Sequence, residues 1–317
     1  MATKIKLGIS SCLLGQKVRF NGGHKHDNYI NNTLCHYFDF EPICPEVAIG
    51  LGTPREPIHL VANPNGLPRL KNINDHRMDH TDALEKLAVD VQPTLKTISG
   101  YILKNRSPTC GMERVKVYNA EGQVLKEKAS GVYARSVLRM LPALPIEEEG
   151  RLGDAEIREN FIERIFVYHR WQQLLASKIS VKNLIDFHTV HTYQIIAHNL
   201  EGYQQLERLI AVAGELELTQ LANAYILELM ETFKHKATRK SHSKILQNIM
   251  DCLQQHIDSD DKAELNQVIN RYRSGEVPLI VPITLLNHHF RRYPNPYIQQ
   301  QYYMNPNPNE LMLRNNL

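Results

Sequence analysis

The pattern of apolar and polar positions divides the chain into two parts of different type. In residues 1–142, short apolar, β-prone runs alternate with longer amphipathic stretches, which is typical of an α/β fold with an open, mostly parallel sheet. The segment V-K-V-Y-N-A-E-G-Q-V-L-K predicts a hairpin that turns at A-E-G-Q. We expect strands at 4–10, 40–44, 100–104, 115–119 and 123–127, and helices at 28–38, 78–97 and 131–141.

From Asp154 onward the pattern is almost wholly helical. Asp154 is expected to cap a helix that runs to about Ser177, with an apolar stripe formed by Ile157, Phe161, Ile165 and Tyr168. Similar stripes occur in SVKNLIDFHTVHTYQIIAHN, TQLANAYILELMETFKHKA and SKILQNIMDCLQQHI. The tail PNPYIQQQYYMNPNPNE is rich in Pro, Asn and Tyr and is expected to be irregular or extended.

A segment rich in proline, glycine and acidic residues separates these two parts. The 317 residues are enough for two domains, and LPALPIEEEGRLGD has the composition of a linker. We therefore expect an α/β N-terminal domain at 1–142, a linker at 143–153 and an all-α C-terminal helical domain at 154–317.

Charge and cysteine content narrow the possible partners and compartment. The net charge is only +3, so any nucleic-acid surface must be a local patch. The N-terminal MATKIKLGISS is too short and polar for a signal peptide, and no apolar stretch approaches the length of a membrane span. An odd number of cysteines, five, without an export signal favours the reducing cytoplasm. Cys35 and Cys252 lie in predicted helices and are interpreted as core thiols.

The other three cysteines each follow an apolar, β-prone run and lie in a turn-rich segment. Cys12 lies in S-S-C-L-L-G, Cys44 in C-P-E-V and Cys110 in S-P-T-C-G-M. Because strand ends in an open α/β sheet form one crevice, we expect the three thiols to meet there. A metal or cluster held by three protein ligands keeps one position free for water or substrate. Buried structural cysteines are the alternative, and spacing alone does not separate the two readings. No C-x-x-C occurs, so zinc ribbons and thioredoxin-like motifs find no support.

Two polar residues accompany these cysteines. Glu46 lies two residues after Cys44, and Ser107 lies three residues before Cys110. A carboxylate near an open metal position can take a proton from water, and a hydroxyl can orient that water. The structural alternatives are a first-turn acid or N-cap for Glu46 and a turn or cap residue for Ser107.

Four segments together resemble the TudS thiouracil desulfidase family along about the first 145 residues. They are S-C-L-L-G, V-R-F-N-G-G, I-C-P-E-V with G-L-G-T-P-R, and K-N-R-S-P-T-C-G-M. The resemblance implies an oxygen-sensitive [4Fe-4S] cluster with one open iron, held by Cys12, Cys44 and Cys110. It also implies acid/base and orienting roles for Glu46 and Ser107. The sequence departs from the family at Thr109, where Ser is common. We expect the flanking residues to hold base or phosphate, namely Arg19, Asn21 and Arg55.

The helical part carries two basic segments that are candidates for RNA binding. Residues 233–244 contain no acidic residue and, if helical, form a positive turn that attracts phosphates. Their cations are Lys234, Lys236, Arg239, Lys240 and Lys244. Farther on, Arg291 and Arg292 are interleaved with aromatic side chains that can stack on bases. The alternative to RNA binding is that the basic residues form a solvated helix face and that the tyrosine-rich tail packs on the helices. A charge run alone favours this alternative.

Three histidines share one helical stripe in the segment H-T-V-H-T-Y-Q-I-I-A-H. His188 and His191 have a spacing that allows metal binding, but His198 lies too far along the helix to join them. We therefore interpret the three as polar packing or RNA contacts.

The second part resembles the YbgA-type helical domain over about residues 185–303. The segments are H-T-V-H-T-Y-Q-I-I-A-H-N, A-T-R-K-S-H-S-K-I-L-Q-N-I-M and R-Y-R-S-G-E-V-P-L-I-V-P-I-T-L-L-N-H-H-F. The two-domain combination resembles the RudS group of tRNA 4-thiouridine desulfidases. This implies loss of sulfur from 4-thiouridine in tRNA, giving uridine and sulfide without net redox change. Two alternatives stay open: a desulfidase of free thiouracil, and a non-enzymatic metal or cluster RNA-binding regulator.

Overall fold

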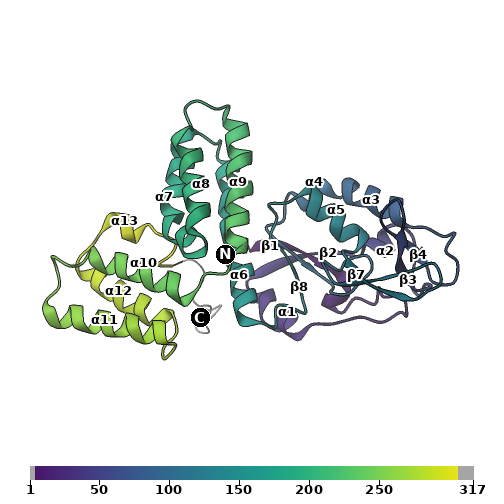
Figure 1. Ribbon diagram of the computed structural model, residues 1–317, viewed down its shortest axis with the longest axis horizontal. Helices are drawn as coiled ribbons and strands as arrows, with labels where there is room; N and C mark the ends of the chain where they lie inside the picture. The colour runs from purple at the N-terminus through teal and green to yellow at the C-terminus, as the bar shows by residue number, and fades with distance from the viewer. Residues whose placement is uncertain (1–3, 306–317) are drawn as a thin grey trace. The chain divides into compact units, whose positions relative to one another are not determined.

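The chain folds into two compact units, Met1–Gly153 and Asp154–Leu317. The computed structural model describes residues 4–305, so residues 306–310 of the tail that was expected to be irregular lie outside the described part (Figure 1). The first unit is α/β and the second is helical, which confirms the expected fold class.

The first unit contains a parallel sheet in which β1 lies between β2 and β5. The strands are β1 (Ile5–Ser10), β2 (Phe38–Ile43), β5 (Tyr101–Leu103) and β8 (Ile146–Glu148), in the order β2-β1-β5-β8. All three pairings are parallel. Five of the six residues of β1 are buried, because a strand covered on both faces carries a nearly continuous apolar run.

The strand β8 was not expected, because it lies inside the predicted linker at 143–153. All three of its residues are buried, including Glu147 and Glu148. These acids are satisfied by polar partners: Glu148 Oε1 accepts from Met112 N at 2.7 Å, and Arg151 lies 2.9 Å from Glu147. The acidic composition of residues 143–153 therefore led to the prediction of a linker, although the segment contains a strand that completes the sheet.

A second, mixed sheet has the order β4-β3-β6-β7. Its strands are β3 (Ile58–Asn63), β4 (Gly66–Asn72), β6 (Val115–Tyr118) and β7 (Val124–Ala129). The antiparallel pair β6–β7 confirms the predicted hairpin. The β3–β4 hairpin was not predicted, although Asn65 and Gly66 at its turn are a hairpin signal. Pro68 argued against a strand there, but β4 lies at the sheet edge, where proline is tolerated.

Short helices connect these strands. They are η1 (Ser11–Leu14), α1 (Asn28–Asn32), η2 (Leu34–His36), α2 (Pro45–Ala48), α3 (Thr81–Asp90), α4 (Gln92–Leu95) and α5 (Val132–Met140). In Figure 1, α3, α4 and α5 lie together on one side of the sheets. The helix expected at 28–38 breaks at Thr33, and the one expected at 78–97 divides at Val91. Pro93 explains the second break, because it lacks the N–H needed inside a helix and instead lies in the first turn of α4.

The first turn of α5 packs directly on the loop that carries Cys110. Val132 N donates to Pro108 O at 3.1 Å, and Ala134 N donates to Thr109 O at 3.1 Å. No side chain caps this helix, so the loop carbonyls accept from its unpaired N–H groups instead. A Cβ atom on Gly131 would lie 2.5 Å from Thr109 O, so only glycine permits this approach.

The second unit consists of helices throughout its described residues. They are α6 (Ala155–Ala176), α7 (Val181–His198), α8 (Leu200–Ala211), α9 (Leu218–Lys234), α10 (Arg239–Asp251), α11 (Ser259–Ser274), α12 (Ile280–Arg292) and α13 (Pro296–Gln299). Asp154 caps α6 as expected, accepting from Glu156 N and Ile157 N. Within residues 4–305, none of the helices is long and apolar enough to cross a membrane.

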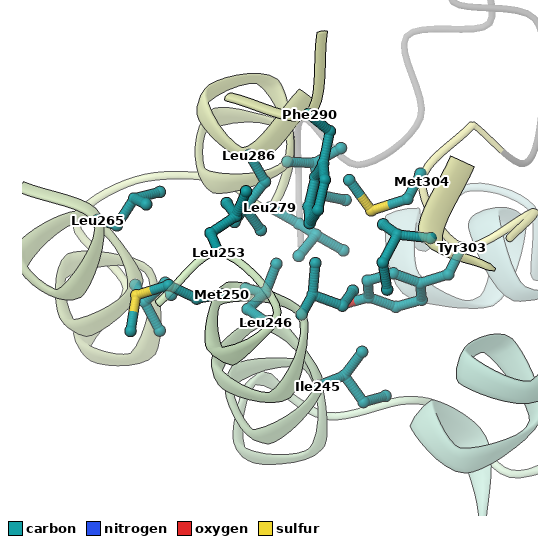
Figure 2. Packing of buried hydrophobic residues seen from close by; sticks show 14 of the residues in the cluster. Ile245, Leu246, Met250, Leu253, Leu265, Leu279, Leu286, Phe290, Tyr303 and Met304 are labelled. Carbon is teal, nitrogen blue, oxygen red and sulfur yellow. The ribbon is translucent and has the colours of Figure 1, made fainter. Parts of the chain in front are cut away.

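Part of the tail packs into the hydrophobic core of the second unit: Pro296–Gln299 forms the short helix α13, and residues 300–305 are irregular, as expected for this segment. Figure 2 shows Leu246 of α10, Phe290 of α12 and the tail residues Tyr303 and Met304 around one core. Tyr303 is fully buried, and its hydroxyl lies 3.0 Å from Nδ1 of His242. The tail therefore ties α10 and α12 together.

We expect Leu246→Ala to lower the free energy of unfolding by about 2–5 kcal/mol, because it removes a fully buried side chain and leaves a cavity. The matched control is Leu227→Ala, on α9, whose side chain is 46% exposed and whose loss should cost less than about 0.5 kcal/mol. Denaturant unfolding followed by circular dichroism measures both. Equal losses in the two variants would contradict the position of this core.

We expect Gly131→Ala to destabilise the first unit by about 1–3 kcal/mol, because its methyl group would force α5 away from the Cys110 loop. Gly153→Ala is the matched control, since the nearest atom to its added Cβ is 3.9 Å away. Thermal unfolding of the two variants measures the difference. A Gly131→Ala protein as stable as the control would show that the loop yields without cost.

Candidate active site

A pocket of about 390 Å³ opens where β1, β2 and β5 end. Its walls come from the three segments that follow these strands, as expected for the carboxyl edge of a parallel sheet. The structure brings together in this pocket all five residues predicted for the chemistry: Cys12, Cys44, Cys110, Glu46 and Ser107. The volume falls within the range of small-molecule sites.

Each of the three cysteines lies in the turn or short helix that follows its strand. Cys12 lies in η1, whose end at Gly15 has φ +86°, a conformation that favours glycine. Cys44 is the N-cap of α2, and Pro45 follows in the first turn. Cys110 is buried after the turn that starts at Ser107. The strand ends thus fix the backbone of all three thiols.

The thiols lie in surroundings that oppose their ionisation in the free protein. Burial raises the pKa of Cys12 to about 11, with partial opposition from the charge of Lys104. Burial also raises the pKa of Cys44, and it raises that of Cys110 well above the ordinary value. The charges of neighbouring thiolates add to this effect at Cys12 and Cys110. Such thiols fit a site in which a bound metal centre supplies the positive charge and displaces the protons.

The donor set has the chemistry of a site for a soft metal centre. In the part of the chain that the structure describes, no group of three or more His, Cys, Asp or Glu side chains is placed to hold a metal ion. Three thiolates are soft ligands that suit iron–sulfur clusters and do not suit magnesium or calcium.

Glu46 is held by an ion pair with Arg55. Nε of Arg55 donates to Oε2 of Glu46 at 2.9 Å, and Nη2 donates to the same oxygen. The side chain of Glu46 is only 14% exposed, and that of Arg55 is only 6% exposed. Arg55 was predicted to hold base or phosphate, but most of its hydrogen-bonding capacity is directed at Glu46 and at the carbonyl of Gly52.

Ser107 has the turn role that was one of the two readings of its position. Its Oγ accepts from Thr109 N at 3.2 Å and from Cys110 N at 3.0 Å, which is the turn role. The hydroxyl hydrogen is still available to a group in the pocket. Ser107 therefore shapes the loop of Cys110 and presents a donor beside it.

The other two residues predicted to bind substrate differ in their position relative to the pocket. Arg19 lines the pocket, whereas Asn21 is exposed and does not line it. The Asn21 side chain instead accepts a hydrogen bond from Gly23 N at 3.1 Å, as is common for Asn in turns. Asn21 therefore stabilises the turn of the V-R-F-N-G-G segment in which it lies.

Sequence reasoning missed three cations of the pocket wall: Lys25, Lys104 and Arg106. Nζ of Lys104 pairs with Glu149, and Asn105 N donates to Oε2 of the same carboxylate at 2.7 Å. Arg106 has φ +55°, a conformation that a non-glycine residue rarely adopts. The run K-N-R before S-P-T-C placed these charges close to Ser107, and that proximity was the signal available.

The remaining two cysteines lie outside the pocket. Cys35 is half-buried in η2, where its thiol contacts Asn31 O at 2.7 Å. Cys252 is exposed at the end of α10, so the expectation that it is a core thiol was wrong. Met250 and Leu253 on either side of it are buried, so Cys252 lies beside the apolar stripe, on the solvent side.

The basic segment 233–244 was expected to form a positive turn if it were helical, but it is not one continuous helix. α9 ends at Lys234 and α10 begins at Arg239. Three of its cations have protein partners: Lys234 pairs with Glu231, Lys236 pairs with Glu156, and Arg239 donates to Tyr272 O. Of the seven cations predicted to bind RNA, Lys240, Lys244, Arg291 and Arg292 are exposed and form no ion pair with any residue in 4–305.

The three histidines of α7 are packing residues. His188 lies 3.0 Å from the hydroxyl of Tyr225 and 2.8 Å from Glu207. His191 is fully buried, and burial lowers its pKa to about 3. His198 contacts Glu163 at 3.1 Å. This burial leaves them little surface for RNA.

Comparison with known proteins assigns each half of the chain to a family. A family model described as 2-thiouracil desulfurase matches residues 7–149, and a model described as a protein of unknown function, DUF1722, matches residues 192–308. The uncharacterized protein YbgA of Escherichia coli (strain K12) is 27% identical over 152 residues, which are 48% of this chain and 90% of that protein. The uncharacterized protein YbbK of Bacillus subtilis (strain 168) is 32% identical over 133 residues, which are 40% of this chain and 85% of that protein.

Among solved structures, a protein described as a [4Fe-4S]-dependent thiouracil desulfidase TudS is similar to part of the chain. The identity is 26% and the TM-score is 0.36, with 47% of this chain and 94% of that chain covered. The family models confirm the resemblance of both halves. The chain therefore belongs to the 2-thiouracil desulfurase family through residues 7–149 and continues into a YbgA-like DUF1722 domain.

Proposed function

We propose that the protein is a [4Fe-4S]-dependent desulfidase that removes sulfur from 4-thiouridine in tRNA. The observation that carries the proposal is the convergence of three thiols, a carboxylate and a hydroxyl in one pocket at the sheet edge. Membership of the 2-thiouracil desulfurase family supports the loss of sulfur from a thiolated pyrimidine.

The cluster would be held by Cys12, Cys44 and Cys110. The solved TudS structure is described as [4Fe-4S]-dependent, and the donor set here fits the same group. With these three protein ligands, a bound cluster would supply Lewis-acid chemistry toward a thiocarbonyl sulfur.

The protein side chains manage the water that replaces sulfur. A thiocarbonyl and water give a carbonyl and hydrogen sulfide, so no electrons are gained or lost. Glu46 accepts the proton of the attacking water, and its position in the pocket wall allows this contact. The hydroxyl of Ser107 orients the water or donates to the departing sulfur. The apolar part of the wall, such as Val18 and Ile43, limits the access of other water.

The charges of the pocket wall favour a nucleotide over a neutral base. Arg19, Lys25 and Arg106 line the pocket, and none forms an ion pair with a carboxylate within residues 4–305. Three uncompensated cations attract a phosphate group, which free thiouracil lacks. In the helical unit, the exposed Lys240 and Lys244 offer further phosphate contacts, which supports a polynucleotide as substrate.

A desulfidase of free thiouracil is the second candidate, because the matching family model is described by that base. The deciding experiment is anaerobic cluster reconstitution, followed by sulfide release from tRNA that contains 4-thiouridine and from free 4-thiouracil. Nucleoside analysis of the treated tRNA identifies the product. Faster release from tRNA supports the proposal, and release from the free base alone contradicts it.

We expect Cys12→Ala, Cys44→Ala and Cys110→Ala each to lose the reconstituted cluster, because each removes one of three ligands. Cys35→Ala and Cys252→Ala are matched controls that remove thiols outside the pocket. Iron content and visible absorption after anaerobic reconstitution measure the loss. Full iron retention in any of the first three variants would exclude that cysteine as a ligand.

We expect the double variant Lys240→Ala/Lys244→Ala to bind tRNA more weakly and with a flatter salt dependence. Each lost phosphate contact reduces the log–log slope of affinity against salt by roughly 0.7–0.9. Lys234→Ala/Lys236→Ala is the matched control, because these lysines already pair with Glu231 and Glu156. Filter binding across a salt series measures the slopes. An equal change in both variants would show a diffuse charge effect in place of specific contacts.

A further inference from the structure

The pocket contains a charged pair whose geometry reveals a role for Arg55 that differs from substrate contact. We propose that Arg55 is a positioning residue that holds Glu46 so that one carboxylate oxygen faces the reacting water. This inference rests on the proposed function, since it assigns Glu46 as the group that accepts the proton.

The guanidinium of Arg55 is almost fully occupied by the protein. Nε and Nη2 both donate to Oε2 of Glu46, and Nη1 donates to Gly52 O at 2.8 Å and approaches the Thr53 hydroxyl at 3.4 Å. A guanidinium has five N–H donors, so this arrangement uses four of them. With a side chain only 6% exposed, Arg55 has little capacity left to bind a substrate phosphate.

The loop between Glu46 and Arg55 reverses direction, which brings the guanidinium of Arg55 back to the carboxylate of Glu46. Leu51 N donates to Glu46 O at 3.1 Å, which closes the end of α2. Gly50 and Gly52 have φ of +87° and +69°, so the chain reverses through conformations that favour glycine. Arg55 N then donates to Phe20 O at 2.8 Å, which ties the loop to another residue of the pocket wall.

The result for Glu46 is an asymmetric carboxylate. Oε2 accepts both hydrogen bonds from Arg55, whereas Oε1 has no hydrogen-bond partner among the described residues. Oε1 is therefore the oxygen available to the pocket, and the fork of Arg55 restricts rotation of the carboxylate about its terminal bond. Arginine suits this role better than lysine, because its planar fork fixes direction while an ammonium acts as a point charge.

A double-mutant cycle tests the inference. The variants are Arg55→Met, Glu46→Gln and the double variant, each reconstituted anaerobically and checked for iron content. We expect Arg55→Met to lower kcat by about 10²-fold, the loss typical of a misplaced catalytic group, with KM changed less than about twofold. The double variant should be no slower than Glu46→Gln, because a residue that acts only through Glu46 has nothing left to position.

Arg19→Met is the matched control, since Arg19 lines the same pocket without an ion pair to any carboxylate in residues 4–305. It should raise KM by a similar factor in the wild-type and Glu46→Gln backgrounds. Arg55→Lys, which retains the charge and guards against misfolding of the Met variant, should recover only part of kcat. Equilibrium titration with uridine 5′-monophosphate gives a readout apart from turnover: Arg55→Met should keep the wild-type affinity, and Arg19→Met should lose it.

The outcomes separate this inference from the proposed function. Multiplicative losses in the double variant, a raised KM in Arg55→Met, or a loss of its nucleotide affinity would each overturn the positioning role. A wild-type protein that carries iron and releases no sulfide from any thiolated pyrimidine would refute the proposed function, and the inference with it.

Discussion

The site depends on one constraint, the parallel pairing of β1 with β2 on one side and β5 on the other. Parallel strands end at the same edge, so residues that are 32 and 66 positions apart in sequence, Cys12 to Cys44 and Cys44 to Cys110, reach one pocket. Ser10 in β1 pairs with Ile43 in β2, which places both strand ends at the same level. A shift of this pairing would separate the thiols even if every loop kept its local shape.

The loops after the strands convert this edge into a chemical site. In the Cys110 loop, backbone N–H groups donate to the hydroxyl of Ser107, and backbone carbonyls accept hydrogen bonds from α5. The carboxylate of Glu149 binds the Lys104 side chain and the Asn105 backbone N–H. Each of these contacts reaches outside the loop or across its turn. The pocket is consequently a rigid surface in which buried thiols and charged groups are held at fixed positions before any ligand binds.

The sequence predicted the parts of this arrangement that depend on local pattern. Apolar runs ending in Gly or Pro turns located β1, β2 and β5 and therefore the cysteines. The pairing of Arg55 with Glu46 was not accessible, because it requires the path of the loop through Gly50 and Gly52. β8 was missed because Glu147 and Glu148 are buried acids, and the backbone partner of Glu148 comes from the distant Met112. In the helical unit, the break between α9 and α10 divided a charge run that composition alone presented as continuous.

The position of β8 has a consequence for the boundary of the first unit. β8 pairs with β5 and so keeps Tyr101, Ile102 and Leu103 in the interior of the sheet. A fragment that ended at residue 142 would leave these apolar residues on an open strand edge, which is a template for association between chains. The first compact unit therefore extends to Gly153, next to the Asp154 cap of α6, and a fragment that keeps its parallel sheet complete must include the acidic segment that resembles a linker.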